Sequence, residues 1–383
     1  MKPWIAIFAF LLAACGGGGP DPIVQAPIPQ LGDPNPDLNV AERSAFNAGK
    51  KVFERRFKRS EGHGPDFNTN SCRSCHELPV AGGSSPLYRN FSIVADVQAN
   101  ALVPILDDGQ IVSRNFSYTR VAREAIPATA QVVAQRNAPA IFGVGLLATI
   151  PPTDITANQD PNDTSPSDGI SGRANFDGTL VSRFGFKAQE ADLVDFVRGP
   201  IFNHMGITTD PLLVAPPLRG APQVSTPGGT TDNDGVPDPE LSNQDLSDLV
   251  VFTRELAPPQ PLPLTALAQQ GEQVFVTIGC AKCHIPNIVT AGDPIFAYTD
   301  LLLHDMGADL DDGVLMGLAE GSEFRTAPLW GLRHHAPYLH DGRADTISDA
   351  VLAHGGEAVG ARDEFNMLDA ADLAAILAFL ESL

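Results

Sequence analysis

Apolar residues recur at helical spacing around two similar stretches of the chain. Residues 49–53 read Gly-Lys-Lys-Val-Phe, and residues 271–275 read Gly-Glu-Gln-Val-Phe. The second stretch lies in an amphipathic segment, residues 267–278, whose apolar positions are spaced by four and three as on one face of a helix. These positions are Leu267, Gly271, Val274, Phe275 and Ile278. We therefore predict the same helix in both places, followed in the first copy by a loop over residues 60–71.

A second predicted helix closes each of these units. Ser242, a favoured N-cap residue, begins one of them, and Pro258 and Pro259 end it because proline cannot continue a helix. Asp369 begins the other. The apolar stripes consist of Leu246, Leu249, Val250 and Leu256 in the first helix and of Leu373, Ile376, Leu377 and Leu380 in the second. Each unit thus opens and closes with a helix.

The composition allows two globular domains with long loops. Of the 383 residues, 43% are hydrophobic and 19% are charged, so the chain can bury two cores and lacks the apolar depletion of disordered proteins. The 35 Gly and 33 Pro residues favour long ordered loops, and strand signals are weak throughout. We predict a mainly α fold with one domain over residues 41–260, including a long insertion, and another over residues 261–383. The boundary falls in the proline-rich stretch 258–263.

The N-terminus has the features of a bacterial export signal. The apolar run after Lys2 is shorter than the roughly 20 residues that a membrane-spanning helix needs. Residues 12–15 read Leu-Ala-Ala-Cys, as in lipoprotein signals, which predicts removal of residues 1–14 and lipidation of Cys15. An ordinary signal cleaved elsewhere is the alternative. Residues 15–40, rich in Gly and Pro, would form a flexible tether at the cell envelope, periplasmic or outer-membrane associated.

The other four cysteines form two copies of one motif. Residues 72–76 read Cys-Arg-Ser-Cys-His, and residues 280–284 read Cys-Ala-Lys-Cys-His. This spacing is the attachment signature of c-type haem, because the two cysteines share one side of a helical turn and can bond the haem vinyl groups. The next residue then offers an imidazole nitrogen to the iron. The predicted haem-binding residues are Cys72, Cys75 and His76 for one covalently bound haem c and Cys280, Cys283 and His284 for the other.

Two other interpretations of the cysteines are weaker. A structural zinc site would use the four thiolates and leave the two adjacent histidines unexplained. Thiol–disulfide motifs usually begin a helix after a strand, and neither segment shows such a strand.

Further motifs resemble those of bacterial dihaem cytochrome c peroxidases. They occupy residues 136–139, 199–206, 324–332 and 337–342. Three others resemble hallmarks of the branch called dihaem oxidoreductase, putative peroxidase, also labelled thiol oxidoreductase. They are Asp-Gly-Ile-Ser-Gly-Arg at 168–173, Leu-His-Asp-Met-Gly at 303–307 and His-Gly-Gly-Glu-Ala at 354–358. The resemblance covers residues 41–383 and implies two cytochrome c-like helical domains with one haem each.

His354 is the predicted sixth ligand of the second haem. It follows His340 at the place where, by resemblance, the peroxidases carry the methionine ligand of their electron-transfer haem. Histidine in place of methionine would keep the iron six-coordinate and lower its reduction potential. A solvent-facing histidine at a helix end is the alternative. His63, which stands between two glycines, is expected in an exposed loop.

His204 departs from the peroxidase pattern. In the peroxidases a catalytic glutamate precedes Met-Gly in this motif, and here His204 stands in that place. Three interpretations stay open. His204 could be a general acid/base that helps to split the O–O bond of a peroxide. It could instead ligate the first haem iron and block it, or it could be a structural residue outside the pocket.

Two further features concern the space between the haems. The superfamily carries a tryptophan there, but residues 146–150 read Leu-Leu-Ala-Thr-Ile. Trp330 could provide the electron path instead, or it could be a core aromatic beside the second haem. The peroxidases also carry a calcium ion, and the matching positions are the Asn137 side chain and the carbonyls of His335 and Pro337. Oxygen ligands of this kind suit calcium.

The main functional hypothesis is an enzyme. The N-terminal haem would reduce peroxide or a related oxidant with electrons passed by the C-terminal haem. The alternatives are a dihaem electron carrier without a substrate site and an oxidase of side chains on a partner protein. A net charge of −21 argues against a nucleic-acid partner. An acidic surface suits docking of a basic electron donor or acceptor, such as a small cytochrome or cupredoxin, or serves solubility alone.

Overall fold

The computed structural model describes residues 29–106, 110–209, 234–289 and 294–383. Its α-helices are α1 (Val40–Glu54), α2 (Val144–Thr149), α3 (Pro152–Thr156), α4 (Leu193–Met205), α5 (Asn243–Glu255), α6 (Ala266–Thr277), α7 (Ile347–Leu352), α8 (Val359–Asn366) and α9 (Ala370–Ser382). Its strands are β1 (Asp66–Phe67), β2 (Phe91–Gln98), β3 (Ala101–Pro104), β4 (Phe116–Ser117), β5 (Val132–Arg136), β6 (Phe176–Asp177), β7 (Leu180–Val181), β8 (Leu303–Asp305) and β9 (Glu323–Arg325). Two 3-10 turns, Cys72–Ser74 and Cys280–Lys282, contain the cysteine motifs.

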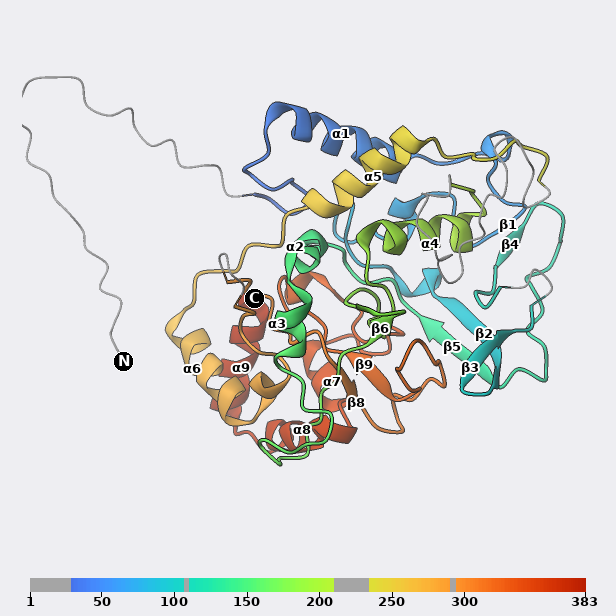
Figure 1. The fold of residues 1–383 in the computed structure, drawn as a ribbon. Coiled ribbons are helices and arrows are strands. Elements are labelled where there is room, and N and C mark those ends of the chain that lie inside the picture. The colour runs from blue at the N-terminus through green and yellow to red at the C-terminus, as the bar shows by residue number, and fades with distance from the viewer. Residues whose placement is uncertain (1–28, 107–109, 210–233, 290–293) are drawn as a thin grey trace, which may run out of the picture.

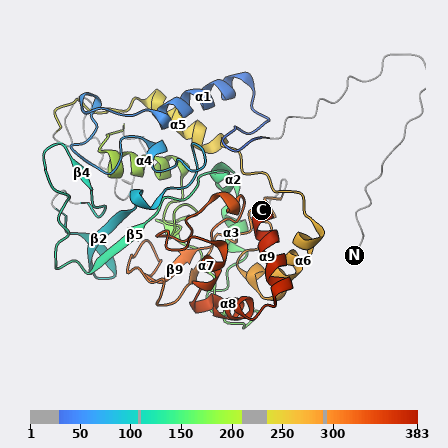
Figure 2. The same cartoon turned by 180° about the vertical axis from the view of Figure 1, so that it is seen from behind.

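Two helix pairs dominate the architecture, and the predicted capping residues begin both closing helices. α1 packs along α5, and α6 packs along α9 (Figures 1 and 2). The Ser242 hydroxyl accepts a hydrogen bond from the backbone of Asp245, and the Asp369 carboxylate accepts from the backbone of Ala371. These contacts satisfy amide groups that would otherwise be unpaired in the first turn of each helix. The predicted closing helices are therefore confirmed.

The two pairs use the same close contact between helices. A Cβ on Gly49 would overlap the backbone of Asp248 in α5, and a Cβ on Gly271 would overlap the backbone of Ala375 in α9. Glycine is thus required at these positions because the helix backbones touch there. Four residues further along, an aromatic pair completes each contact. Ring centroids are 4.8 Å apart for Phe53 and Phe252 and 5.3 Å apart for Phe275 and Phe379.

The apolar face predicted for residues 267–278 is correct only in part. Gly271 and Phe275 are buried against α9. Leu267 is 44% exposed, and Ala268 is buried in its place. The helix is therefore rotated slightly from the orientation that apolar spacing alone predicted.

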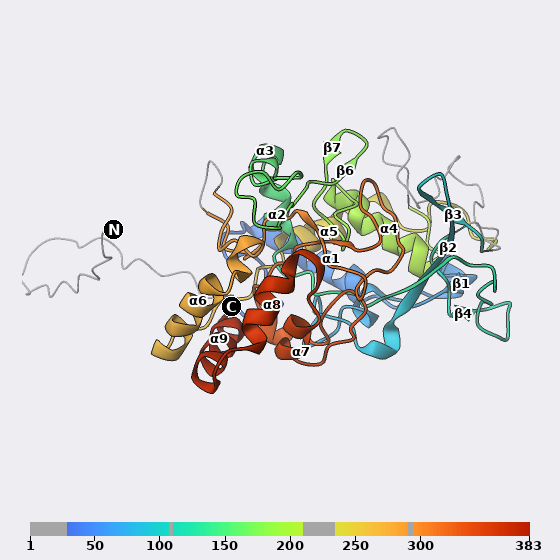
Figure 3. The ribbon, with the colours of Figure 1, turned by 90° about the horizontal axis from the view of Figure 1, so that it is seen from below.

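Strands are more frequent than the sequence indicated, which corrects the expectation of a mainly α fold. Helices account for 34% of the described residues, and strands and bridges for 15%. The largest sheet in the described residues has three antiparallel strands in the order β3-β2-β5, with Phe91 opposite Arg136 and Ala95 opposite Val132. Figure 3 shows this sheet on the side of the molecule remote from α6 and α9. Buried and exposed residues alternate along β5, as in a strand with one covered face.

The core built on α1, α2, α4 and α5 reaches across the predicted boundary at residue 260. It also contains Ile288, Ala297, Leu301 and Trp330 from the C-terminal part of the chain. A second core lies between α6 and α9 and includes Phe365 of α8. The two parts of the chain therefore share apolar contacts, and their division into separate domains stays a prediction.

The predicted signal peptide, residues 1–14, and Cys15 lie outside the described residues. The last part of the predicted tether is packed against the protein. The Asn35 backbone N–H donates to the carbonyl of Glu255 at 2.8 Å, and Leu31 and Leu38 contact the first core. Among the described ranges, none of the helices has the length and apolar character needed to cross a bilayer.

We expect the substitution Gly271→Ala to destabilise the protein by about 2 kcal/mol or more, because the added methyl group forces α6 and α9 apart. Urea unfolding of the holo-protein measures the loss. The matched control is Gly360→Ala in α8, where a Cβ has open space and should stabilise by about 0.5 kcal/mol. Equal stability of Gly271→Ala and the natural protein would show that the helices can separate without cost.

Candidate functional site

The first cysteine motif forms one tight turn. The backbone N–H groups of Cys75 and His76 both donate to the carbonyl of Cys72 at 3.1 Å, and the Ser71 hydroxyl accepts from the Ser74 N–H. These bonds bring the two cysteines and the histidine onto a single turn. Burial raises the pKa of Cys72 to about 12 and that of Cys75 to about 11. Both side chains are therefore neutral thiols, and they form no disulfide.

The second cysteine motif repeats this turn directly after α6. The backbone N–H of His284 donates to the carbonyl of Cys280 at 3.0 Å, and burial raises the pKa of Cys280 to about 12. Cys72 packs on the first core and Cys280 on the second. Within the described part of the chain, no three His, Cys, Asp or Glu side chains are grouped as a metal site. The four thiols therefore do not form the zinc site considered as an alternative.

The two histidines of these motifs are held in the same way. Nδ1 of His76 donates to the carbonyls of Pro139 at 3.0 Å and Gly83 at 3.2 Å. Nδ1 of His284 donates to the carbonyl of Tyr298 at 2.9 Å. A carbonyl only accepts, so Nδ1 carries the proton and Nε2 keeps a lone pair. Metal-bound histidines are usually held by such a bond from the other ring nitrogen.

These residues fit a haem iron. Burial lowers the pKa of His76, and it lowers that of His284 to about 4, so both imidazoles are neutral and can donate a lone pair near neutral pH. Each lies next to two cysteines on the same turn. The donor set is the one that a haem attached through Cys-x-x-Cys-His requires.

His354 lies near His284. It follows α7, its backbone N–H donates to the carbonyl of Val351, and its Nδ1 donates to the carbonyl of Ala350 at 2.7 Å. His354 therefore has the same tautomer as His76 and His284. Its proximity contributes to the lowered pKa of His284, after the larger effect of burial. The structure thus brings together the two histidines predicted as ligands of one iron.

His204 lies in a different environment near the first motif. It is in the last turn of α4, which ends at Gly206 in the left-handed conformation. Its backbone carbonyl accepts from the Asn68 N–H at 2.7 Å. Its ring contacts the ring of Phe91, with centroids 4.3 Å apart. Burial, then the charge of Arg114 and the proximity of His76, lowers the pKa of His204 to about 3.

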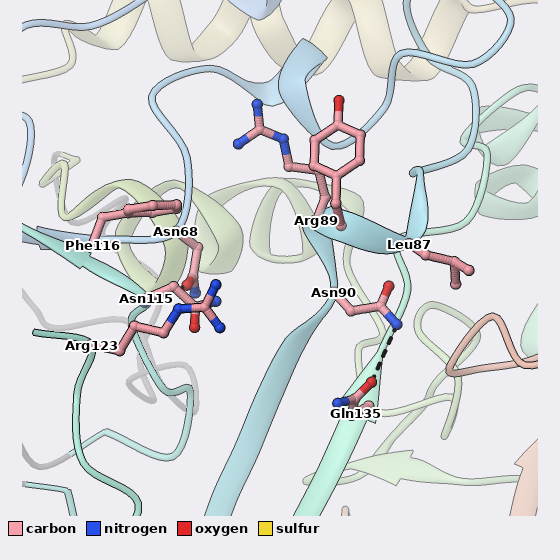
Figure 4. Close-up of a pocket in the computed structure, with 9 residues that line it drawn as sticks. Asn68, Leu87, Arg89, Asn90, Asn115, Phe116, Arg123 and Gln135 are labelled. Carbon is pink, nitrogen blue, oxygen red and sulfur yellow. Dashed lines mark hydrogen bonds between the residues drawn. The ribbon is translucent and has the colours of Figure 1, made fainter.

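Asn68, which contacts the His204 ring, also lines a polar pocket of about 300 Å³. Its lining residues are Asn68, Leu87, Tyr88, Arg89, Asn90, Asn115, Phe116, Arg123 and Gln135. Figure 4 shows Asn68, Asn115, Phe116 and Arg123 on one side and Leu87, Arg89, Asn90 and Gln135 on the other. Asn68 connects the pocket to the histidine, because its Nδ2 lies 3.2 Å from His204 Nδ1. This pocket could not be predicted from the sequence, because none of its residues belongs to a recognised motif, although Gln135 directly precedes the one at 136–139.

Three of the sequence motifs meet in a buried ionic cluster beside the second cysteine motif. His304 donates from Nδ1 to Glu357 at 2.8 Å and from Nε2 to Asp300 at 2.9 Å. Glu357 also accepts from the hydroxyl of Ser171 at 2.5 Å. Cys283 Sγ lies 3.7 Å from His304 Nδ1. Ser171, His304 and Glu357 belong to the motifs at 168–173, 303–307 and 354–358, respectively.

The charges in this cluster are fixed near neutral pH. Burial alone would lower the pKa of His304, but its hydrogen bonds, above all with Asp300, outweigh burial and raise the pKa to about 12. Burial alone would raise the pKa of Glu357, but hydrogen bonds from His304 and Ser171 lower it to about 2. His304 is therefore a cation held between two carboxylates.

The predicted calcium ligands lie where the two parts of the chain meet. The Asn137 backbone N–H donates to the carbonyl of His340 at 2.8 Å, and its Nδ2 donates to Asn90 Oδ1 at 2.7 Å. The carbonyl of Ala336, between His335 and Pro337, accepts from the Ser84 hydroxyl at 3.1 Å. The sequence segments that contain the three predicted ligands are thus anchored to the same loop, residues 84–90.

Trp330 and His63 are both buried, although His63 was predicted to be exposed. Trp330 is 7% exposed and belongs to the first core, against the loop at Gly143. His63, expected in an exposed loop, is only 1% exposed, so that prediction was wrong. Its Nε2 donates to the carbonyl of Thr69 at 2.9 Å, and its Nδ1 accepts from the Tyr118 hydroxyl at 3.0 Å. These bonds compensate the burial of a polar ring.

Two Cys-x-x-Cys-His turns with similarly held histidines are characteristic of a dihaem protein. The family model described as "Di-haem oxidoreductase, putative peroxidase" matches residues 123–383, more than half of the chain. The chain therefore belongs to this family of di-haem oxidoreductases. The match begins after the first cysteine motif.

Several solved structures are also similar to the chain. They include a dihaem peroxidase, BthA, from Burkholderia thailandensis, with 16% identity, 89% of this chain and 86% of that chain covered and a TM-score of 0.45. A MauG-like protein associated with microbial copper homeostasis has 16% identity, coverage of 93% and 94% and a TM-score of 0.40. Hydrazine synthase from Kuenenia stuttgartiensis has 14% identity, coverage of 98% and 99% and a TM-score of 0.38. A search of curated proteins found no match.

We expect Glu357→Gln to cost about 2 kcal/mol of stability at pH 7, because His304 loses a buried carboxylate partner. Glu357 has a lower pKa in the folded protein, about 2, than its ordinary 4.5. Its contribution is therefore complete above about pH 4.5 and is lost as the pH falls toward 2. Urea unfolding of both proteins at several pH values measures the difference.

The control is Asp363→Asn, which removes the carboxylate of an exposed ion pair with Arg362 and should change stability by less than about 0.5 kcal/mol. A cost for Glu357→Gln that is the same at pH 7 and at pH 2.5 would mean that the charge of Glu357 does not stabilise the fold.

Proposed function

We propose that this chain is a peroxidase-like dihaem oxidoreductase with two covalently attached c-type haems in cytochrome c-like domains. The N-terminal haem, held by His76, would supply the iron for reduction of peroxide or a related oxidant, and the C-terminal haem, held by His284 and His354, would supply the electrons. A bound haem supplies the redox-active iron at which the O–O bond is cleaved. Reduction of one hydrogen peroxide to two waters consumes two electrons and two protons. The two protons must reach the site where the peroxide is reduced, which is the first haem in this proposal.

The difference between the two sites is the observation that carries this proposal. At the second site His284 and His354 both donate from Nδ1 to carbonyls, so both can offer Nε2 to one iron. Such a site is closed to substrate and suits electron transfer. At the first site His76 has this arrangement, but His204 makes no hydrogen bond from its ring to a carbonyl among the described residues. One face of the first haem would then stay open.

The pocket beside His204 supports a small polar substrate. Its lining includes the amides of Asn68, Asn90 and Asn115 and the guanidinium groups of Arg89 and Arg123. Such walls solvate hydrogen peroxide well and offer little apolar surface to a lipophilic hydroperoxide. We therefore propose hydrogen peroxide as the substrate and this pocket as its route to His204.

Electrons would enter at the second haem from a partner protein. The net charge of −21 supports docking of a basic small cytochrome or cupredoxin. Trp330 lies in the first core although it follows the second cysteine motif in sequence, so it is a candidate for the path between the haems.

A calcium ion held by Asn137, His335 and Pro337 would fix the loops between the sites. Elemental analysis of the purified protein, with less than one calcium per chain, would contradict the calcium proposal.

We expect both haems to remain on the chain after denaturation, because they are covalently attached. We also expect the half-reduced holo-protein to contain one high-spin haem whose absorption spectrum shifts promptly with hydrogen peroxide. His204→Leu should slow the peroxide reaction by about 100-fold or more, because the proton-handling imidazole is removed. Stopped-flow absorption measures the rate. His334→Gln, which removes a histidine outside both sites, should leave it unchanged. Two low-spin haems that ignore peroxide in both redox states would instead identify an electron carrier.

We also propose that Cys15 carries a lipid anchor at the bacterial cell envelope, on the evidence of residues 12–15. The full-length protein expressed in a Gram-negative host should then require detergent for extraction, because acyl chains partition into the bilayer. Cys15→Ser should release the protein into the soluble periplasmic fraction. Recovery of both forms without detergent would contradict the anchor.

A further inference from the structure

The orientation of the Asn68 side chain is fixed by backbone groups. Its Oδ1 accepts the N–H of Asn115 at 2.9 Å, and its Nδ2 donates to the carbonyl of Ser113 at 2.9 Å. A flipped amide would place oxygen against the Ser113 carbonyl and N–H against N–H, which loses both bonds. The amide nitrogen of Asn68 therefore faces Ser113, and its second hydrogen remains available.

That second hydrogen determines where the proton sits on His204. Nδ2 of Asn68 lies 3.2 Å from Nδ1 of His204 and can only donate. Nδ1 of His204 must therefore accept, and in a neutral imidazole the proton then sits on Nε2. This is the opposite of the tautomer at His76, His284 and His354, where a carbonyl holds the proton on Nδ1.

The tautomer argues against one of the three interpretations of His204, ligation of the first haem iron. An imidazole ligates iron through a lone pair, and Nε2 of His204 carries a hydrogen instead. To ligate the iron through Nε2, His204 would have to move its proton to Nδ1 and lose the bond from Asn68. It is, however, ready to donate a hydrogen bond to an oxygen atom, as a bound peroxide requires.

We propose that Asn68 is a positioning residue that keeps the proton of His204 on Nε2, so that His204 presents a hydrogen-bond donor to the oxidant and does not itself ligate the first haem iron. The proposal rests on the proposed peroxide reaction at the first haem. It assigns a function to a residue of the pocket that lies outside the motifs shared with the peroxidases.

The test is to reverse the bond with Asn68→Asp. A carboxylate accepts from Nδ1, which moves the proton there and gives Nε2 a lone pair. We expect the first haem of the oxidised holo-protein to change from high-spin to low-spin, as electron paramagnetic resonance and absorption measure. We also expect the peroxide reaction to slow by about 100-fold or more. The double variant Asn68→Asp with His204→Leu should return to high spin, because no imidazole remains to bind.

Asn115→Asp is the matched control, because it adds the same charge to the same pocket, and among the described residues the His204 ring is hydrogen-bonded to Asn68 and not to the Asn115 side chain. It should keep the first haem high-spin. If Asn68→Asp does not fold, Asn68→Leu removes the donor without adding charge. It should then give a partly low-spin first haem that becomes high-spin again when His204 is also replaced.

The outcomes separate this proposal from the proposed function. A natural protein that reacts with peroxide, together with Asn68 variants that stay fully high-spin, overturns the assignment to Asn68 and leaves the function intact. A high-spin first haem that ignores peroxide overturns the function. A first haem that is already low-spin through His204 in the natural protein overturns both.

Discussion

The contact between helix backbones at Gly271 supports the geometry of the whole second site. Because this residue has no Cβ, α6 touches α9, and Phe275 then packs against Phe379 one turn further on. The ring of Tyr298 packs edge-on against both aromatic rings. The carbonyl of the same tyrosine accepts the hydrogen bond that orients His284. The absence of a Cβ at Gly271 therefore helps to position Tyr298, whose carbonyl orients the imidazole of His284.

The four histidines proposed to face the haem irons, His76, His204, His284 and His354, differ in their hydrogen-bond partners more than in their charge. Burial lowers the pKa of all of them, so each is neutral near pH 7. What distinguishes them is the group next to Nδ1, which is a carbonyl at three of them and the amide of Asn68 at His204. A neutral imidazole can be a lone-pair donor or a hydrogen-bond donor, and a single neighbour selects between the two. The two proposed functions, electron transfer at the second haem and peroxide reduction at the first, follow from this difference in tautomer.

Features that depend on local sequence were predicted well, and features that depend on distant contacts were not. Ser242 and Asp369 were correctly assigned as N-caps because a cap is made within one turn. Buried and exposed residues alternate along β5, but its sequence, Val-Val-Ala-Gln-Arg, does not alternate apolar and polar residues, so no strand signal was visible. His63 looked exposed between two glycines, yet Tyr118, far along the chain, covers it. The bond between Asn68 and His204 joins residues 136 positions apart, and no motif signals it.

The ionic cluster at His304 explains why three separated motifs accompany the second cysteine motif. One cation between two carboxylates leaves a net negative charge beside Cys283, and burial weakens the screening of that charge. A nearby negative charge stabilises the oxidised, more positive state of an iron and lowers its reduction potential. The proposed ligation by His354 in place of a methionine would act in the same direction. Under the proposed function both effects favour release of an electron from the second haem, which is the direction that reduction of peroxide at the first haem requires.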